Sequence, residues 1–309
     1  MIQARGRYAV IGFPWDFGAS LGRPGSRYAP KAIREALGWF LRRIVDGKIF
    51  AVEEGEVIDL SEVHIEDMGD LEIYAHDVLR TFDNAYNVIK GYLLKGYTPM
   101  VLGGDHSITY PSVKALHDSV EDYIGIIQFD AHLDLVDENP YQGRYSHSSG
   151  IRRALELERV KRLVQIGVRG YNYPFHYSDV RRYDIMQITP SVIHVRGLRE
   201  IVNSVLRNLD GIGSIYITID IDVLDPSFAP GSGANEPGGL APWELLAFIR
   251  EFAPCSKGID IVEVNPPYDI SNITSTIAAR IAFDYIIYRS ISKCGMSVKD
   301  QNPEATAHR

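Results

Sequence analysis

The sequence has little cysteine, no long apolar run and no concentration of basic residues. Its two cysteines, Cys255 and Cys294, are too few for a disulfide framework or a thiolate metal cage, so we expect two free thiols. No apolar run is long enough to span a bilayer, and the first residues, MIQARGRYAV, lack the layout of a secretory signal. We therefore expect a cytoplasmic protein with no membrane partner.

The charge balance argues against a nucleic-acid partner. The chain carries 40 acidic and 32 basic residues, a formal net charge of -8, and no long run of Lys and Arg. A small or cationic partner is easier to accommodate. With 309 residues, 45% of them hydrophobic, the chain can bury a large core in one large α/β domain or two ordinary ones.

Strand-like and helix-like segments alternate along most of the chain, which predicts an α/β fold with a mostly parallel sheet. The strand-like segments are 8–13, 98–104, 124–129, 162–170, 191–197, 214–226 and 258–267. Helical patterns cover about 30–44, 72–95, 198–210 and 273–291, and further helices begin near residues 108, 151 and 242. The last long helix is apolar on most faces and should be buried, and residues 297–309 are expected to be disordered.

The stretch IGIIQFDAHLD, residues 124–134, begins as a buried strand and ends in a cluster of polar side chains. Asp130, His132 and Asp134 alternate along an extended chain, so they can converge at the carboxyl edge of the sheet. Two carboxylates and one imidazole suit a divalent metal. The alternative is that Asp130 caps a turn, Asp134 is solvated and His132 is an ordinary core histidine.

Two more strand-like segments end in similar groups. The segment TPMVLGG leads into Asp105 and His106. By itself His106 would be a structural histidine. Its strand directly precedes the one that leads to Asp130, however, and consecutive strands are often neighbours in a sheet. The segment SIYITIDIDVLDP carries Asp220 and Asp222 at its end, where buried carboxylates are costly unless a positive group is present. Asp225, which precedes a proline, is expected to form a turn.

These three strand ends together supply enough ligands for two divalent ions that share bridging carboxylates. Four aspartates balance the four positive charges of two ions, and such a pair can lower the pKa of a water between them. A cationic electrophile would be drawn to the resulting anionic site, and Glu263 at a fourth strand end could grip a guanidinium. The candidate ligands are His106, Asp130, His132, Asp134, Asp220 and Asp222.

Two loops stand near these strand ends. Residues 15–29 form a Gly-rich loop that is either an ordered surface loop or part of a pocket rim. His147 lies in a polar, aromatic loop after Asp134 and would by itself be a solvated histidine.

The chain resembles the ureohydrolases, the arginase and agmatinase family. The resemblance rests on GGDHS at Gly103, FDAHLD at Phe129, TIDIDVLDPSFAPGSG at Thr218 and DIVEVNPP at Asp260, and it extends from residue 12 to about 288. The loop GFPWDFGASLGRPGSRYAPKAIR, residues 12–34, is similar to the agmatinase branch. The resemblance implies one α/β/α domain, residues 1–296, with a mostly parallel eight-stranded sheet, and a homo-oligomer, either a trimer or a hexamer.

The resemblance also implies roles for single residues in a binuclear manganese centre, which nickel, cobalt or zinc could also occupy. One ion would be held by His106, Asp130, Asp134 and Asp220, and the other by Asp130, His132, Asp220 and Asp222. In this family an activated water attacks the guanidinium carbon, and an amine and urea leave. His147 corresponds to a proton shuttle and Glu263 to the carboxylate that orients the guanidinium, while Asp105 would polarise a ligand from behind.

Several departures from the family pattern concern the substrate. Val136 replaces the polar residue with which arginases hold the α-carboxylate of arginine, which argues against arginine. Ser148 and Ala234 stand where agmatinases have glycine and threonine, and Asn172 replaces the acidic residue that meets the substrate's amino end in arginases. A pocket wall of tyrosines and an amide is a poor partner for an ammonium, although Asp137 or Glu138 could compensate.

The resulting functional prediction is a manganese agmatinase that cleaves agmatine to putrescine and urea, a step of polyamine biosynthesis. The alternatives within the family are guanidinobutyrate, guanidinopropionate and free guanidine. Binuclear phosphoesterases also open their metal site with Asp-x-His, but they carry a GNH motif and a later His-x-His that this chain lacks. A non-catalytic family member is a remote alternative, since all six ligands are intact.

Overall fold

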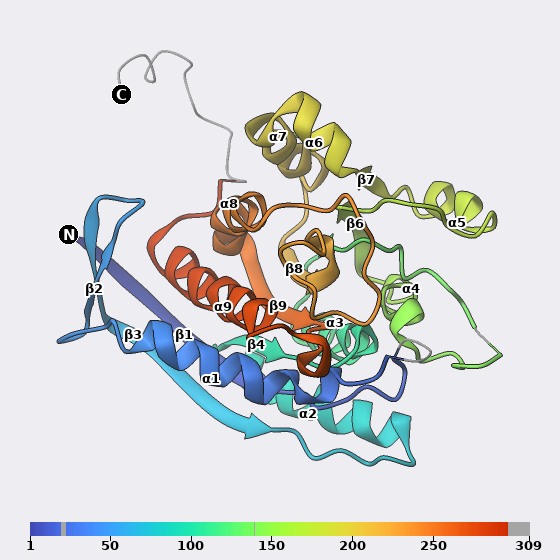
Figure 1. Ribbon diagram of the computed structural model, residues 1–309, viewed down its shortest axis with the longest axis horizontal. Coiled ribbons are helices and arrows are strands. Elements are labelled where there is room, and N and C mark those ends of the chain that lie inside the picture. Colours follow the sequence, from blue (N-terminus) through green and yellow to red (C-terminus); the bar gives the residue numbers. More distant parts are fainter. Residues whose placement is uncertain (20–22, 139, 296–309) are drawn as a thin grey trace.

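The computed structural model describes residues 1–19, 23–138 and 140–295, and these form one nine-stranded sheet (Figure 1). The strand order is β2-β3-β1-β4-β9-β8-β5-β6-β7, and every neighbouring pair is parallel except β2 and β3. The strands are β1 (Ile2–Gly12), β2 (Lys48–Ala51), β3 (Glu56–Asp70), β4 (Thr98–Leu102), β5 (Ile124–Phe129), β6 (Val160–Ile166), β7 (Met186–Ile188), β8 (Ser214–Asp220) and β9 (Ser256–Val262).

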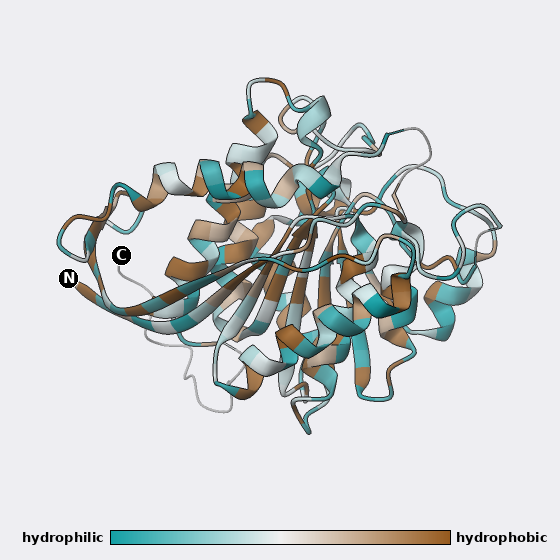
Figure 2. Cartoon of the chain, turned by 90° about the horizontal axis from the view of Figure 1, so that it is seen from below, coloured by the Kyte–Doolittle hydropathy of each residue, from teal (hydrophilic) through white to brown (hydrophobic). Residues whose placement is uncertain are grey.

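Helices cover both faces of this sheet, so the strands form a layer between two layers of helices (Figure 2). One face carries α1 (Ala29–Leu41), α7 (Leu198–Asn208), α8 (Pro242–Phe252) and α9 (Ile273–Ile291). The other carries α2 (Val78–Leu94), α3 (Thr109–His117) and α4 (Gly150–Leu155). The short helices α5 (His176–Arg182) and α6 (Pro190–Arg196) flank β7. The predicted arginase-like α/β architecture is therefore confirmed.

The central strands are buried on both faces, which explains their uninterrupted apolar sequences. Every residue of β5 and of β8 is buried. Parallel strands with helices on both faces bury successive side chains alternately against the two layers, so both sets must be apolar. The predicted buried last helix is confirmed by α9, whose Tyr285 is fully buried and exchanges a hydrogen bond of 2.7 Å with Ser256.

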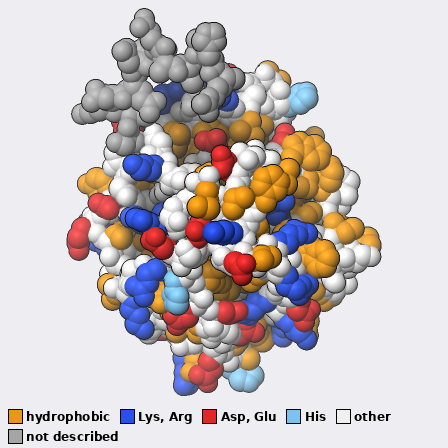
Figure 3. Space-filling view, turned by 90° about the vertical axis from the view of Figure 1, so that its left-hand side faces the viewer, with side chains coloured by type: hydrophobic (Ala, Val, Ile, Leu, Met, Phe, Trp, Pro, Cys, Tyr) orange, Lys and Arg blue, Asp and Glu red, His pale blue; other side chains and the backbone are white. Residues whose placement is uncertain are grey.

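The sheet has nine strands and not the eight that were predicted, and at one edge two of its strands are antiparallel. β2 and β3 form an antiparallel hairpin that the sequence did not predict. β3 is exposed or half-buried along most of its length, so it lacks the apolar run that marks the central strands. Phe50, Val52 and Val57 stay exposed in this hairpin, and Figure 3 looks onto this end of the molecule, where hydrophobic side chains lie among charged ones.

Two other segments differ from the predictions. Residues 191–197, predicted as a strand from their β-branched residues, form α6, because Thr189 caps the helix by accepting a bond from the Val192 N–H and Pro190 fits its first turn. The helix predicted from residue 72 begins at Val78, where the Asp77 side chain accepts from the Arg80 N–H. The predicted disordered tail, 297–309, lies outside the described residues.

The two cysteines are not the free thiols that the sequence led us to expect. Cys255 and Cys294 form a disulfide that ties the segment between α8 and β9 to the segment after α9. Their separation of 39 residues hid the pairing, since sequence distance says nothing about two segments that meet in the fold. None of the helices within the described residues has the length and apolar character needed to cross a lipid bilayer.

Candidate active site

Four adjacent strands at the centre of the sheet end in the polar residues that the sequence singled out. β4, β9, β8 and β5 are neighbours in that order, and their carboxyl ends lead to His106, Glu263, Asp220 and Asp130 respectively. The chain passes from one half of the sheet to the other between these strands, and such switch points are where open α/β sheets bind ligands. The sheet topology therefore brings the candidate ligands together.

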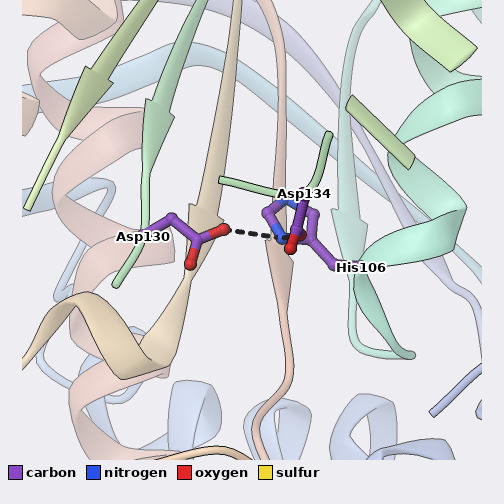
Figure 4. A group of neighbouring side chains, drawn as sticks. All are labelled: His106, Asp130 and Asp134. Carbon is purple, nitrogen blue, oxygen red and sulfur yellow. Dashed lines mark ion pairs between the residues drawn. The ribbon is translucent and has the colours of Figure 1, made fainter. Parts of the chain in front are cut away.

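His106 is the centre of a first cluster. It begins a short turn of 3-10 helix after β4 and is fully buried. Its Nδ1 lies 3.0 Å from Asp130 Oδ2, 2.7 Å from Asp134 Oδ2 and 3.4 Å from Asp220 Oδ2. Figure 4 shows the imidazole pointing from its own strand end towards the two aspartates that follow β5. These residues are placed as one predicted ion site requires.

His132 belongs to a second cluster that shares one aspartate with the first. Its Nδ1 lies 3.0 Å from Asp222 Oδ2 and 3.5 Å from Asp130 Oδ1. The side chain of His132 is 36% exposed, whereas those of Asp130 and Asp222 are buried, so the imidazole faces open space. Within the group of His106, Asp130 and Asp134, and within the group of Asp130, His132 and Asp222, one ligand atom from each residue lies within 4.8 Å of the others, and Asp130 takes part in both groups. Asp130 is therefore placed to bridge two metal ions, one in each cluster.

Backbone N–H groups hold the aspartates in place. The Oδ1 atoms of Asp130, Asp220 and Asp222 accept hydrogen bonds from the N–H groups of His132, Asp222 and Ala131, at 2.6, 2.9 and 3.0 Å. Each carboxylate is thereby fixed through one oxygen, and its Oδ2 is directed towards a histidine. The motifs Asp-x-His and Asp-x-Asp supply the His132 and Asp222 donors locally, which explains their spacing, whereas the Ala131 N–H links the end of β5 to Asp222 after β8.

Two of the site carboxylates sit on unusual backbone. Asp134 has φ of 52° and Glu263 has φ of 61°, in the left-handed region that residues with a side chain rarely adopt. Such conformations persist only where the surrounding structure enforces them, and they concentrate at functional sites. The Glu263 N–H donates to the Gly104 carbonyl at 2.9 Å, which fixes this turn against the one that carries His106.

The buried carboxylates of the site would be stabilised by a positive charge among them. Burial raises the pKa values of Asp220 and Glu263 well above their usual range, and neighbouring carboxylates add to the effect. Burial also raises the pKa of Asp134 to about 6. The charge of Asp222 holds the pKa of His132 well above its usual value. A divalent ion would supply the positive charge that these carboxylates need, and His132 would then coordinate it as a neutral ring.

Two buried atoms of the candidate ligands have no hydrogen-bond partner within the described residues, which bears on whether metal ions fit the site. They are His106 Nδ1 and Asp222 Oδ2. Buried polar atoms left unpaired are costly, so an atom of this kind in each of the two clusters points to a missing ligand. Imidazole nitrogens and carboxylate oxygens are donors for divalent first-row metals. The residues present therefore fit two such ions.

Residues that the sequence did not single out support the ligands from behind. His106 Nε2 lies 2.9 Å from Thr218 Oγ1, so this pair fixes the ring that turns its Nδ1 to the centre. Asp130 Oδ2 accepts from Gln128 Nε2 at 2.7 Å, and Gln165 and Gln187 extend this chain of amides across β6 and β7. Thr218, Gln128 and Gln165 gave a signal in the sequence, because each is a buried polar residue within its strand, whereas Gln187 is exposed in the short strand β7 and gave none.

Asp105 contacts the loop after β1, and its expected role behind a ligand stays a prediction. Its Oδ1 accepts from the N–H and hydroxyl of Ser107, and its Oδ2 accepts from the Gly18 N–H at 2.9 Å. It hydrogen-bonds none of the six candidate ligands, because its side chain turns towards the loop after β1. Asp105 therefore ties that loop to the turn carrying His106, and Thr218 and Gln128 contact the ligands instead.

Glu263 and His147 come together beside the centre. Glu263 Oε1 accepts from the His106 N–H at 3.0 Å and lies 3.7 Å from His147 Nδ1. No described residue donates a hydrogen bond to Glu263 Oε2, and this carboxylate lines the same cavity as His132. Burial, with the positive charges of His132 and His106, lowers the pKa of His147 to about 4. At pH 7 its ring is therefore neutral.

Gln142 fixes the proton on His147. Its Nε2 donates to the Ala19 carbonyl at 3.2 Å and lies 3.0 Å from His147 Nε2. An amide nitrogen only donates, so His147 Nε2 accepts and the ring proton sits on Nδ1, the atom nearer Glu263. The loop after β1 thus contacts the site indirectly through Ala19, although none of its described residues lines the cavity.

A cavity of about 130 Å³ opens beside the candidate centre, which is the size of a small molecule. Its inner side is formed by His132, Asp134, Asp220, Asp222, His147 and Glu263, and its outer wall by Leu133, Val136, Ser148, Asn172, Tyr173, His176 and Ala234. The positions where the sequence departs from the family pattern therefore lie on the outer wall. His176 was not predicted to belong to the site, since nothing near it in the sequence forms a motif.

Asp137 and Glu138, which could have compensated for the missing acidic residue, do not line this cavity. Asp137 instead pairs with Arg144 at 2.9 Å and with Arg153. Asp225 behaves as expected of a turn former, since its carboxylate accepts from Ser227 and from the Gly238 N–H. It lies outside the ligand clusters.

Known proteins that are similar to this chain belong to the family that the sequence motifs resemble. The model of the Arginase family matches residues 6–288. The agmatinase of Bacillus subtilis is 35% identical, with 90% of each chain covered, and the mitochondrial guanidino acid hydrolase of Homo sapiens is 33% identical, with 90% of this chain and 77% of that one covered. The crystal structure of formimidoylglutamase from Bacillus subtilis matches with a TM-score of 0.82 and 29% identity, covering 94% of this chain and 91% of that one.

Proposed function

The chain belongs to the arginase family of hydrolases, and from this premise we propose that it is a binuclear metal ureohydrolase that releases urea from a small guanidino compound. The observation that carries the proposal is the convergence of two histidines and four aspartates, with unpartnered buried atoms, at the ends of three strands, β4, β5 and β8. Family membership narrows the chemistry to guanidino and related amidino groups. The small cavity beside the centre fits a substrate of that size.

The six ligands have distinct places in this proposal. His106, Asp134, Asp130 and Asp220 would hold one ion, and His132, Asp222, Asp130 and Asp220 the other. Manganese is the ion we propose, and nickel, cobalt or zinc are compatible with the same donors. When bound, two such ions would supply a water of lowered pKa as nucleophile at neutral pH.

The remaining steps depend on residues of the chain itself. Glu263 is anchored through Oε1 on the His106 N–H, so its Oε2 is free to accept a guanidinium N–H and turn the guanidinium carbon towards the centre. A carboxylate and a guanidinium make a charge-assisted pair of fixed geometry. His147 would hold a proton on Nδ1 and pass it to the leaving amine, with its other nitrogen kept as an acceptor by Gln142.

Agmatine is the substrate proposed from the resemblance of residues 12–34 to the agmatinase branch, with putrescine and urea as products. A guanidino acid is the second candidate, since every carboxylate that lines the cavity is either a candidate metal ligand or Glu263 and none remains for a distal ammonium. The relatives include an agmatinase and a guanidino acid hydrolase, so both substrate types occur among similar proteins.

Urea release from the manganese-loaded protein tests the proposal. The panel is agmatine, guanidinobutyrate, guanidinopropionate, arginine and free guanidine, and we expect urea from at least one. Asp130→Asn and Asp222→Asn should lose metal and reduce urea release at least about 100-fold, while Asp210→Asn, an exposed aspartate in a turn, should not. Full metal loading without urea from any guanidino compound would contradict the proposal.

A further inference from the structure

Asp260, inside the central strand β9, is a buried carboxylate that the proposed reaction does not use. It is completely buried, and no described residue forms an ion pair with it. Its Oδ2 accepts a hydrogen bond of 3.0 Å from the Tyr216 hydroxyl, whereas its Oδ1 has no hydrogen-bond partner within the described residues. A carboxylate in the core is costly unless other groups replace the water that it loses. The place of Asp260 in the sheet therefore needs a cause.

The neighbours of Asp260 lead to the candidate metal ligand His106. Thr218 on β8 is paired in register with Asp260, and its hydroxyl lies 2.9 Å from His106 Nε2. The hydroxyl of Thr109, at the start of α3, lies 3.1 Å from that of Thr218. Burial raises the pKa of Asp260, while the hydroxyls of Thr218 and Thr109 oppose that effect. Four fully buried side chains thus connect the carboxylate with the back of the imidazole.

The direction of these hydrogen bonds decides which nitrogen of His106 carries the ring proton. Either Thr218 donates to Nε2 of the ring, or Nε2 donates to Thr218. In the first case a neutral imidazole has its proton on Nδ1, and this nitrogen cannot bind an ion. In the second case Nδ1 has a free electron pair and faces Asp130 and Asp134, where the proposed ion would lie.

A carboxylate at position 260 selects the second arrangement, because it only accepts hydrogen bonds. The hydroxyls of Thr109 and Thr218 share one contact, so one of their two protons is left for another acceptor. The open Oδ1 of Asp260 can take that proton, either directly from Thr218 or through Thr109. The Thr218 oxygen is then free to accept from His106 Nε2.

We propose that Asp260 is a positioning residue for the metal site, which acts through Thr218 to keep the ring proton of His106 on Nε2 and its Nδ1 open to the ion. Asp260 forms no hydrogen bond with a candidate ligand among the described residues, so its effect should be confined to the ion that His106 holds. The inference rests on the proposed binuclear function. It gives a role to the first residue of the motif DIVEVNPP, which neither the ligand set nor Glu263 explains.

Manganese binding tests this role without an assay of activity. Asp260→Leu resembles aspartate in shape but has no acceptor, and we expect it to weaken one of the two ions about 10-fold, measured by competition with a chelator. The other ion should change less than threefold. At a manganese concentration that fills both sites of the unmodified protein, electron paramagnetic resonance should show coupled pairs in that protein and single ions in the variant.

Two further variants separate this role from plain packing. Asp260→Asn keeps the size of the side chain and one accepting oxygen, so it should recover part of the affinity, and it carries the test if Asp260→Leu does not fold. Tyr216→Phe removes the other hydrogen bond of Asp260 and should leave both manganese affinities within threefold. The free energy of unfolding of each variant without metal records general damage to the fold.

A double variant tests whether Asp260 acts through Thr218. Asp260→Leu combined with Thr218→Val should weaken manganese binding no more than Thr218→Val alone, because the second substitution already breaks the connection to His106. Losses that add would mean that Asp260 acts by another route.

Each other result overturns a definite statement. Unchanged manganese affinity in both Asp260 variants, an equal loss at both ions, or losses that add to that of Thr218→Val would overturn the role of Asp260 and leave the ureohydrolase function standing. An unmodified protein that binds no manganese and releases no urea would overturn the proposed function, and the role of Asp260 would fall with it.

Discussion

At the residue scale, the candidate site depends on partners that turn each ligand towards the centre. His106 can face the metal centre with Nδ1 because its Nε2 is engaged by Thr218, which is completely buried. Asp130 is held between the His132 N–H and the amide of Gln128. Hydrogen bonds of this kind fix the tautomer and direction of a ligand, and their loss weakens metal binding even when every ligand remains.

Thr218→Val tests this dependence. Valine has nearly the shape of threonine but cannot pair with His106 Nε2, so the ring loses its fixed orientation and a buried polar atom is left unpaired. We expect manganese affinity to fall about 10- to 100-fold, measured by competition with a chelator. Thr276→Val, on the exposed side of α9, is the matched control. Unchanged affinity in Thr218→Val would show that the threonine does not position the ligand.

At the element scale, the sequence predicted the elements that carry the site better than those at the edges. β5 and β8 are buried on both faces, so their apolar runs were plain, and the aspartates that follow them stood out. The hairpin of β2 and β3 was missed because its strands are half-exposed, and α6 was mistaken for a strand because its β-branched residues outweighed its cap. His176 could not be found because its place in the cavity depends on how α5 packs.

Gly150, at the start of α4, shows how closely that helix packs against the turn carrying His106. A Cβ at this position would lie 2.4 Å from the His106 carbonyl oxygen, an approach that backbone atoms cannot relieve without moving. Gly150→Ala should therefore lower the free energy of unfolding by about 1–3 kcal/mol, measured by denaturant titration.

The control is Gly38→Ala in α1, where the nearest atom to an added Cβ is the end of the Arg42 side chain at 3.8 Å. That substitution should be neutral or stabilise the helix by up to about 1 kcal/mol. If both variants unfold alike, the close contact between α4 and the His106 turn does not exist in solution.

The disulfide between Cys255 and Cys294 lies at the opposite end of the sheet from the site. Cys255 directly precedes β9, whereas Glu263 follows it. Closing a loop of 39 residues restricts the unfolded chain and stabilises the fold by about 4 kcal/mol on the loop-entropy relation.

Reduction should therefore lower the melting temperature while leaving urea release per folded molecule unchanged. A thermal melt with and without reductant measures the first effect, and an assay well below the melting temperature measures the second. The double variant Cys255→Ser with Cys294→Ser should melt at the same temperature with and without reductant. A melting temperature that does not respond to reductant in the original protein would contradict the presence of this bond.

At the scale of the whole molecule, the candidate metal ligands come from both halves of the sheet. β4 lies towards the half that carries β1, β2 and β3, and β5 lies towards the half that carries β6 and β7. His106 comes from the first half and Asp130 from the second, with Asp220 between them on β8. Ions held by all of these residues would therefore tie together strands that are far apart in the sequence, and they would also neutralise carboxylates that repel one another.

Removal of the metal should for this reason destabilise the entire domain and not only the site. A ligand that binds the folded chain alone adds about 2.7 kcal/mol to the free energy of unfolding at a free concentration of 100 times Kd. We expect the melting temperature to rise with manganese concentration and to fall when a chelator is added. Asp222→Asn should weaken this response because one of the two ions loses a ligand, and Asp130→Asn should weaken it further because Asp130 belongs to both clusters. A melting temperature that stayed constant across the manganese titration would contradict the binuclear site. It would mean that the chain itself stabilises the carboxylates around His106 without a metal ion.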